Sequence, residues 1–251
     1  MLKTKEKIID FLEEKQIKNY VLTDDLVVNV NGDVFLNNQN LSSFPVQFGM
    51  VSKSFDCSHN KLLSLKGAPK EVGTYFDCTN NELTSLEYGP QVVGGTYQAN
   101  HNQLKSLKYV ATKIGNDLMV CGNHLENLLY CPEIIPGYIN VADNQLKTLL
   151  GCAKEAGALH LGNNQLESLE HISEYVHFLI MVEDNPLKTL EFLPAKFQEI
   201  RFDINNLSYD FSLIDKKDNK TISLLEVELR KLILENKLNT KKTSYKSTHK
   251  I

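Results

Sequence analysis

The chain has 251 residues, of which 42% are hydrophobic, enough to bury a large core. Its formal net charge is −4 and its pI is about 6.0, so the chain as a whole lacks the basic character of most nucleic-acid-binding proteins. The charged first residues are followed by no apolar segment of a secretory signal, and no apolar run approaches the roughly 18 residues of a membrane span. Five cysteines without the spacing of a zinc site or a disulfide framework then predict reduced thiols in a cytoplasm.

The first 32 residues predict an N-terminal cap made of a helix and a hairpin. Thr4 is suited to cap the start of a helix that runs to about Gln16. Tyr20 to Val30 then predicts a hairpin with Asp24 and Asp25 at its turn, because apolar residues alternate after that turn. The apolar side of the helix holds Ile8, Ile9, Phe11 and Leu12, and the alternating residues of the hairpin are Leu26, Val28 and Val30.

A repeat of 20 or 21 residues fills the centre of the chain. Segments 55–65 and 76–86 align without gaps and share the pattern apolar-x-apolar-x-x-Asn-x-Leu-x-x-Leu. A first repeat at 34–44 has Gln39 in place of the Asn, and the last has Asp210 where a final Leu is expected. The sequence therefore predicts nine repeats over residues 33–211, with atypical repeats at both ends. The repeated asparagines are Asn60, Asn81, Asn102, Asn123, Asn144, Asn164, Asn185 and Asn205.

This pattern resembles the leucine-rich repeat family, L-x-x-L-x-L-x-x-N-x-L, over roughly Asp33 to Phe211. The linkers at 65–73 and 86–95 look like those of short leucine-rich-repeat proteins from bacteria and their phages. The resemblance implies a repeat solenoid with a parallel concave sheet, a largely irregular convex side and helical caps at both ends. It also implies that the protein binds another protein rather than catalysing a reaction.

The spacing within one repeat explains how such a solenoid would be held together. The apolar-x-apolar pair has a period of two, so it predicts a short strand with both apolar residues facing inward. One repeat cannot bury these residues alone, whereas stacked repeats form a continuous core. The Asn turns the chain inward after the strand, and its amide can bond to backbone groups that no strand reaches. The predicted core columns include Phe55, Phe76, Tyr97, Leu118, Ile139, Leu159, Ile180 and Ile200; Cys57, Cys78, Ala99, Val120, Val141, Leu161, Val182 and Phe202; and Val51, Val72, Val93, Ile114, Ile135, Ala156, Val176 and Phe197. The residues that indicate an irregular convex side are Gly67, Pro69, Gly89, Pro90, Gly94, Gly95 and Pro132.

The C-terminal residues predict a second cap and a basic tail. Thr221 to Lys237 has a helical apolar stripe, so we assign residues 212–238 to a capping helix whose apolar face could instead dock a partner. Residues 239–251 form a tail without acidic residues, which is either solvated and flexible or in contact with nucleic acid or an acidic protein. The stripe consists of Ile222, Leu225, Leu229, Leu232 and Ile233.

The strand residues that point away from the core predict an acidic concave face. The five outward columns hold ten acidic and two basic residues, a formal charge of −8, which is suited to attract a basic or amphipathic protein. The acidic residues are Asp33, Asp56, Asp77, Glu82, Asp117, Asp143, Glu183, Asp184, Glu199 and Asp203, and the basic residues are Lys61 and Arg201. The predicted partner-binding set is Phe35, Asp56, Tyr75, Asp77, Gln98, His101, Asp117, Met119, Tyr138, Asn140, His160, Met181, Glu183 and Arg201.

Catalytic and metal chemistry finds little support in the sequence. His59 and His101 lie two repeats apart, about 10 Å by strand spacing, too far to bind one zinc ion. The Cys121-x-x-His124 spacing lacks a second ligand pair, and the acidic columns would disfavour a Cys121 thiolate. The other four cysteines are expected to be small buried hydrophobic residues. We therefore predict no catalytic residue, metal or cofactor.

Several functional hypotheses follow. The leading hypothesis is a cytoplasmic protein-interaction module, which in a phage would be an inhibitor or adaptor of a host bacterial protein. A second hypothesis is that the acidic face mimics nucleic acid and blocks a DNA- or RNA-binding protein. A third is a structural component of a virion or a surface. An enzyme is the weakest hypothesis, because no Ser-His-Asp or phosphate-binding signature is present.

Overall fold

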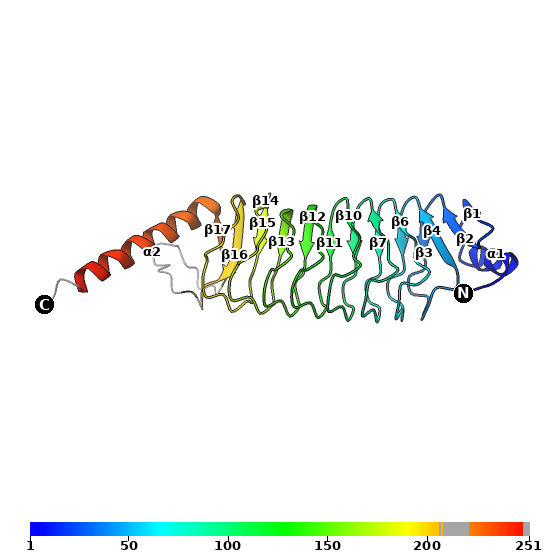
Figure 1. Ribbon diagram of the computed structural model, residues 1–251, viewed down its shortest axis with the longest axis horizontal. Helices are drawn as coiled ribbons and strands as arrows, with labels where there is room; N and C mark the ends of the chain where they lie inside the picture. Colours follow the sequence, from blue (N-terminus) through cyan, green and yellow to red (C-terminus); the bar gives the residue numbers. More distant parts are fainter. Residues whose placement is uncertain (206, 208–220, 248–251) are drawn as a thin grey trace.

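The computed structural model describes residues 1–205, 207 and 221–247. Parallel strands stack along the long axis of an elongated solenoid, and a helix lies at each end of the stack (Figure 1). In the view of Figure 1 the stack runs nearly straight, so we name the outward side of the strands the strand face rather than the concave face. The chain therefore has the parallel-sheet solenoid fold that its repeat pattern predicts.

One parallel row of strands carries the repeated apolar-x-apolar pair. Neighbouring strands pair in register, so that Phe55 lies opposite Phe76 and Phe76 lies opposite Tyr97. Within the described residues this row has nine strands, one from each repeat. They are β3 (Val34–Phe35), β5 (Phe55–Asp56), β7 (Phe76–Asp77), β9 (Tyr97–Gln98), β11 (Leu118–Met119), β12 (Ile134–Asn140), β13 (Glu155–His160), β15 (Leu179–Met181) and β16 (Glu199–Asp203).

A second, shorter row precedes the first in each repeat, where the sequence indicates an irregular convex side. Its residues are aligned by packing, because Val51, Val72 and Val93 point into the core. At the corner between the rows a Cβ on Gly94 would overlap the carbonyl oxygen of Gly73, so glycine allows the repeats to approach there. The strands of this row are β4 (Gln47–Val51), β6 (Glu71–Val72), β8 (Val92–Val93) and β10 (Lys113–Ile114), and β14 (Tyr175–Val176) pairs with β13.

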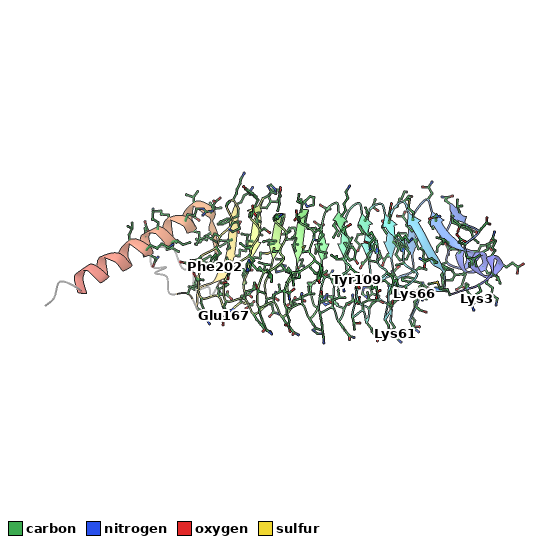
Figure 2. The ribbon with its side chains drawn as sticks, in the orientation of Figure 1. Lys3, Lys61, Lys66, Tyr109, Glu167 and Phe202 are labelled. Carbon is green, nitrogen blue, oxygen red and sulfur yellow. The ribbon has the colours of Figure 1, made fainter. Side chains whose placement is uncertain are left out.

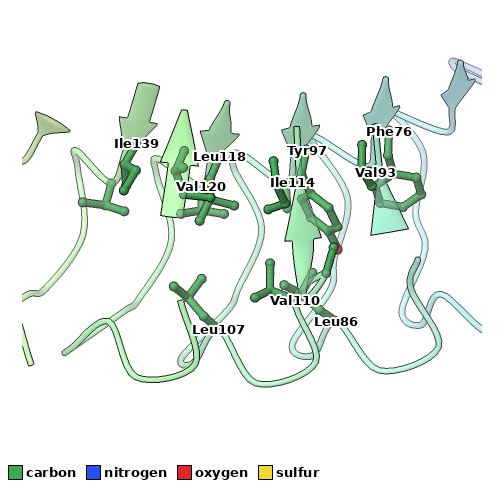
Figure 3. Packing of buried hydrophobic residues seen from close by; sticks show 14 of the residues in the cluster. Phe76, Leu86, Val93, Tyr97, Leu107, Val110, Ile114, Leu118, Val120 and Ile139 are labelled. Carbon is green, nitrogen blue, oxygen red and sulfur yellow. The ribbon is translucent and has the colours of Figure 1, made fainter. Parts of the chain in front are cut away.

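The core runs the length of the stack. The inward strand residues, the two leucines that follow the Asn, and the residue seven positions after the second Leu are buried in successive repeats. Figure 3 shows this packing for Phe76, Tyr97 and Leu118, with Leu107 and Ile114 from the other columns. The predicted core columns are therefore confirmed.

A ladder of buried asparagines joins each repeat to the one before it. The Asn123 amide nitrogen donates to the carbonyl oxygens of Val120 at 3.1 Å and of Ala99 in the preceding repeat at 3.0 Å. Its side-chain oxygen accepts from the Leu104 backbone N–H at 3.0 Å. The buried asparagines with this arrangement are Asn60, Asn81, Asn102, Asn123, Asn144, Asn164 and Asn185. The prediction that Asn205 extends the ladder is wrong in one respect: this residue is exposed, because no further repeat of the described chain covers it.

The N-terminal end is closed by α1 (Lys5–Glu14) and a hairpin. The Thr4 hydroxyl accepts from the Lys7 backbone N–H at 3.4 Å and caps the helix as expected. β1 (Tyr20–Leu22) pairs antiparallel with β2 (Val27–Val30), which continues the second row through β4. Leu26 lies in the turn at a φ of 60° instead of in the strand. The helix buries Ile8, Phe11 and Leu12 against the core.

The C-terminal end differs from the prediction. Residues 221–225 form β17 (Thr221–Leu225), an antiparallel partner of β16, because Leu224 packs inward and the strand satisfies the last edge of the row. Leu225 is consequently exposed and not part of a helical stripe. α2 (Glu226–Ser247) follows at once and extends into the predicted tail. Asp210, the boundary at Phe211, residues 212–220 of the predicted capping helix and residues 248–251 of the predicted tail lie outside the described residues. Within the described chain, no helix is both long and apolar enough to cross a membrane.

Candidate protein-binding face

The strand face consists of the outward side chains of the nine first-row strands, β3, β5, β7, β9, β11, β12, β13, β15 and β16, and of the turns that follow them. Figure 2 draws the side chains along the stack and labels Lys61, which belongs to this face. Of the predicted partner-binding residues, Phe35, His101, Tyr138 and Arg201 are exposed. The half-exposed members are Asp56, Tyr75, Gln98, Asp117, Met119, Asn140, His160, Met181 and Glu183. The stack therefore brings these side chains to one side, in columns that advance by one strand per repeat.

Asp77 does not belong to the exposed set. Its carboxylate accepts from the Tyr75 hydroxyl at 2.7 Å and from the Thr79 backbone N–H at 2.7 Å, and only 7% of the residue is exposed. Partial burial and the hydrogen bond to Asp77 raise the pKa of Tyr75 above its usual range. Asp203 is likewise 7% exposed. The accessible part of the face therefore has eight acidic residues against two basic ones, less than the sequence predicts but still strongly acidic.

Asp117 is both an acidic surface group and a tie between repeats. Its carboxylate accepts from the Thr96 hydroxyl at 3.0 Å, the Asn116 amide at 2.9 Å and the Tyr138 backbone N–H at 2.7 Å. These donors come from three successive repeats. The carboxylate therefore stays half-exposed while it fixes the position of Tyr138 beside it.

The residue before each ladder asparagine has a left-handed backbone. His59, His101, Asp143 and Asp184 occupy this column with φ values of 54°, 50°, 55° and 53°. Asn, Asp and His tolerate this conformation better than most residues that have a Cβ. The turn thus favours short polar residues in this column, which is a structural reason for part of the acidity that the sequence suggests.

The acidic residues of the later repeats surround a hollow in the strand face. Asp143, His160, Glu183 and Asp184 line a space of about 640 Å³. The Asn163 amide donates to the Asp143 carboxylate at 2.6 Å and holds one wall of the hollow. Carboxylates from two repeats, which are separated by the repeat of β13, therefore face this space.

The thiol chemistry of the face is unfavourable at Cys121. Partial burial and the nearby Asp143 carboxylate raise the pKa of this thiol. The His124 ring nitrogen is hydrogen-bonded with the Gln145 amide at 3.2 Å instead of with the thiol. All five cysteines are free thiols, and the described residues contain no group of three side chains suited to hold a metal ion.

Sequence reasoning missed a second regular surface feature, the turn edge opposite the strands. Tyr88, Tyr109, Tyr130 and Phe192 are exposed there and have φ values of 69°, 71°, 74° and 64°. In the first of these turns the Gly89 backbone N–H donates to the Leu86 carbonyl oxygen. Tyr88 therefore occupies the third position of a four-residue turn, where a positive φ usually requires glycine. The signal was present in the sequence, since Leu-x-Tyr recurs at intervals of 21 residues.

Comparison with known protein families and with curated proteins gives no match. Among solved structures the chain is similar to YopM, a leucine-rich effector protein from Yersinia pestis, at a TM-score of 0.35 and 18% identity. The alignment covers 70% of this chain and 66% of that chain, so this chain spans just under two thirds of the length of the YopM chain. The chain's own parallel sheet, asparagine ladder and columns of inward leucines are the features of a leucine-rich-repeat solenoid fold. Repeat solenoids present extended surfaces that such proteins use for binding.

Proposed function

We propose that this protein is a non-catalytic interaction module that binds a basic or amphipathic surface of another protein through its strand face. The observation that carries the proposal is the charge of this face, on which eight accessible acidic residues are opposed by two basic ones. One of those cations is already engaged, because Arg201 pairs with Glu199 at 3.0 Å. The excess of acidic over basic side chains in these columns would attract a basic partner.

The rigidity of the face favours such binding. The asparagine ladder and the strand pairing fix the spacing of the carboxylates, so little order has to be gained when a partner binds. A surface dominated by one sign of charge also accelerates encounter with a partner of the opposite sign, and salt screens this effect.

Two aromatic side chains can supply apolar contact beside the charges. Phe35 is 59% exposed near the start of the stack, and Tyr138 is 38% exposed in its middle. Aromatic groups of this kind are enriched at the centres of protein interfaces, where they contribute much of the binding energy. The partner should therefore present apolar residues among its basic ones.

The biological setting belongs to the same proposal. The linkers at 65–73 and 86–95, which look like those of bacterial and phage proteins, favour an inhibitor or adaptor that acts on a host protein in the bacterial cytoplasm. No separate observation favours a nucleic-acid mimic or a structural component over this role.

A synthetic amphipathic helix with lysines on one side and leucines on the other is a suitable probe. Its dissociation constant would be measured by fluorescence anisotropy with the wild type, Asp56→Lys, Glu183→Lys and the control Glu71→Lys, which makes the same charge change on β6 outside the strand face. We expect each strand-face variant to weaken binding by about tenfold, and the control to leave it unchanged. The proposal would be refuted if all three variants changed the dissociation constant equally, or if none of them changed it.

The same variants identify the natural partner in a host lysate. A protein that co-purifies with the wild type and with Glu71→Lys, but not with Glu183→Lys, meets the requirement of strand-face binding. A partner retained by both strand-face variants would place the interface elsewhere on the solenoid.

A further inference from the structure

The start of α2 is fixed to the last repeats. The Glu226 backbone N–H bonds to the Gln198 carbonyl at 3.0 Å, and the Arg230 guanidinium donates to the Pro194 carbonyl at 2.7 Å. Leu229 and Leu232 are buried against the end of the core. The first two turns of α2 therefore act as a cap and set the direction of the rest of the helix.

The remainder of α2 extends beyond the stack without covering it (Figure 1). Leu234 is 59% exposed and Leu238 is 50% exposed, although both are apolar. The segment 234–247 would be about 21 Å long at the rise of an α-helix. A lone helical segment of this length is only marginally stable in water, so contact with another surface would stabilise it.

The charge of this projecting segment is opposite to that of the strand face. The sequence from residue 236 onward contains five lysines and no acidic residue: Lys237, Lys241, Lys242, Lys246 and Lys250. Lys241, Lys242 and Lys246 lie within α2. Two exposed leucines and the lysines within the helix give this segment apolar and basic groups, which are the groups that the strand face is suited to bind.

We propose that α2 of one copy docks on the strand face of a second copy, over β12 to β16. The inference rests on the proposed function, because it names a second copy of the chain as a partner of the strand face. A segment of about 21 Å spans about four strands at a spacing of about 4.8 Å. The last four strands of the row are β12, β13, β15 and β16, and the turns after β12 and β15 carry Asp143, Glu183 and Asp184, which line the hollow in the face.

The direction of α2 favours exchange between copies over folding back. The helix leaves the stack at its C-terminal end and points away from its own strands (Figure 1). Two copies that meet at their C-terminal ends around a twofold axis can each place α2 on the strand face of the other. Such a twofold arrangement is closed, uses the same contact twice and is the commonest symmetry of homo-oligomers.

The oligomeric state of the full chain tests this inference by sedimentation velocity over a range of concentrations, at low and high salt. We expect a dimer that dissociates as salt rises, because the contact is electrostatic. The variant Lys241→Glu/Lys242→Glu and the variant Glu183→Lys should each raise the dimer dissociation constant by about tenfold or more. The two sets of changes combined in one chain should restore dimerisation, since the charges again become opposite.

A matched control is Glu82→Lys. Glu82 is an exposed acidic residue of the same face, but it follows β7, outside the four strands that the helix would reach. This change should leave the dimer dissociation constant unaltered. Unchanged circular dichroism would confirm that every variant keeps its fold.

Three results would overturn the inference: a monomer at all concentrations in low salt, an equal effect of Glu82→Lys, or failure of the combined charges to restore the dimer. The peptide titration described above separates this failure from that of the proposed function. A monomeric chain that still binds the basic peptide, and loses it on Glu183→Lys, would retain the binding function without self-association. If Glu183→Lys affects neither event, both proposals are wrong.

Discussion

The rings of Phe76 and Tyr97 pack against each other in adjacent repeats, with centroids 5.0 Å apart and planes at 49° (Figure 3). Phe55 continues the same column with its centroid 6.0 Å from that of Phe76. Tyr97 is fully buried, and among the described residues its hydroxyl has no hydrogen-bond partner. Burial accordingly raises the pKa of Tyr97 far above its ordinary value.

Replacing Tyr97 with Phe should stabilise the protein. A buried hydroxyl without a partner costs free energy, and the phenylalanine ring fits a column that already holds Phe55 and Phe76. We expect the free energy of unfolding in urea to rise by about 1 kcal/mol. The matched control is Tyr75→Phe, which removes the hydrogen bond to Asp77 and should lower stability or leave it unchanged. A loss of stability in Tyr97→Phe would indicate a partner for the hydroxyl.

Asn123→Ala should be strongly destabilising. The change leaves the Leu104 N–H and the carbonyl oxygens of Val120 and Ala99 without their side-chain partner inside the stack. Because several buried polar groups are affected at once, we expect a loss on the order of 3 kcal/mol in chemical denaturation. Asn205→Ala is the control, since Asn205 is exposed and should lose far less. Similar losses at both positions would contradict the role assigned to the buried ladder.

The repeat spacing predicted the stack and its core because packing forces every repeat to place the same residue at the same depth. Phe55, Phe76 and Tyr97 are examples, since each is inward-facing and fully buried. Such agreement fails where no repeat follows. Asn205 is exposed, and Thr221 to Leu225 pair as a strand with the last repeat although their apolar spacing suggests a helix. This strand pairing joins residues that are about 20 positions apart in the sequence, and at the edge of the sheet it outweighs the local helix propensity of residues 221–225.

The candidate face was less predictable than the core. The position of a residue within the repeat predicts whether its side chain points outward, but it does not predict which outward side chains form hydrogen bonds with one another. Asp77 is covered by Tyr75, and Asp117 is held by donors from three repeats, so neither is simply a free surface charge. The left-handed turn at Asp143 and Asp184 depends on backbone angles that a count of charges does not contain. These residues show why the acidity of the face was overestimated while its sign was predicted.

Gly151→Ala should destabilise the turn edge. Gly151 has a φ of 87°, and a Cβ there would lie 2.6 Å from the Leu128 carbonyl oxygen and 2.5 Å from the Leu129 Cα. Because the added Cβ would meet backbone atoms of the preceding repeat, which cannot rotate away, we expect a loss of about 1–3 kcal/mol in thermal or urea unfolding. Tyr130→Gly changes the equivalent position of the preceding repeat, where the side chain is exposed, and should stay within about 1 kcal/mol of the wild type. A neutral Gly151→Ala would show that the neighbouring repeat can move aside.

The Asp143→Asn variant should make Cys121 react faster with iodoacetamide. Burial is the larger cause of the raised pKa of Cys121, and the Asp143 carboxylate adds to it by disfavouring the negative thiolate. Removing that charge lowers the pKa of Cys121. At a fixed pH between about 7 and 8, which is below the pKa of an ordinary thiol, the thiolate fraction of Cys121 should then increase severalfold, and the alkylation rate with it. Asn also tolerates the left-handed backbone at this position, so the turn should be preserved. Asp56→Asn, in an earlier repeat, serves as the control and should leave the rate at Cys121 unchanged when peptides are quantified by mass spectrometry. An equal rate in the wild type and in Asp143→Asn would mean that burial alone governs this thiol.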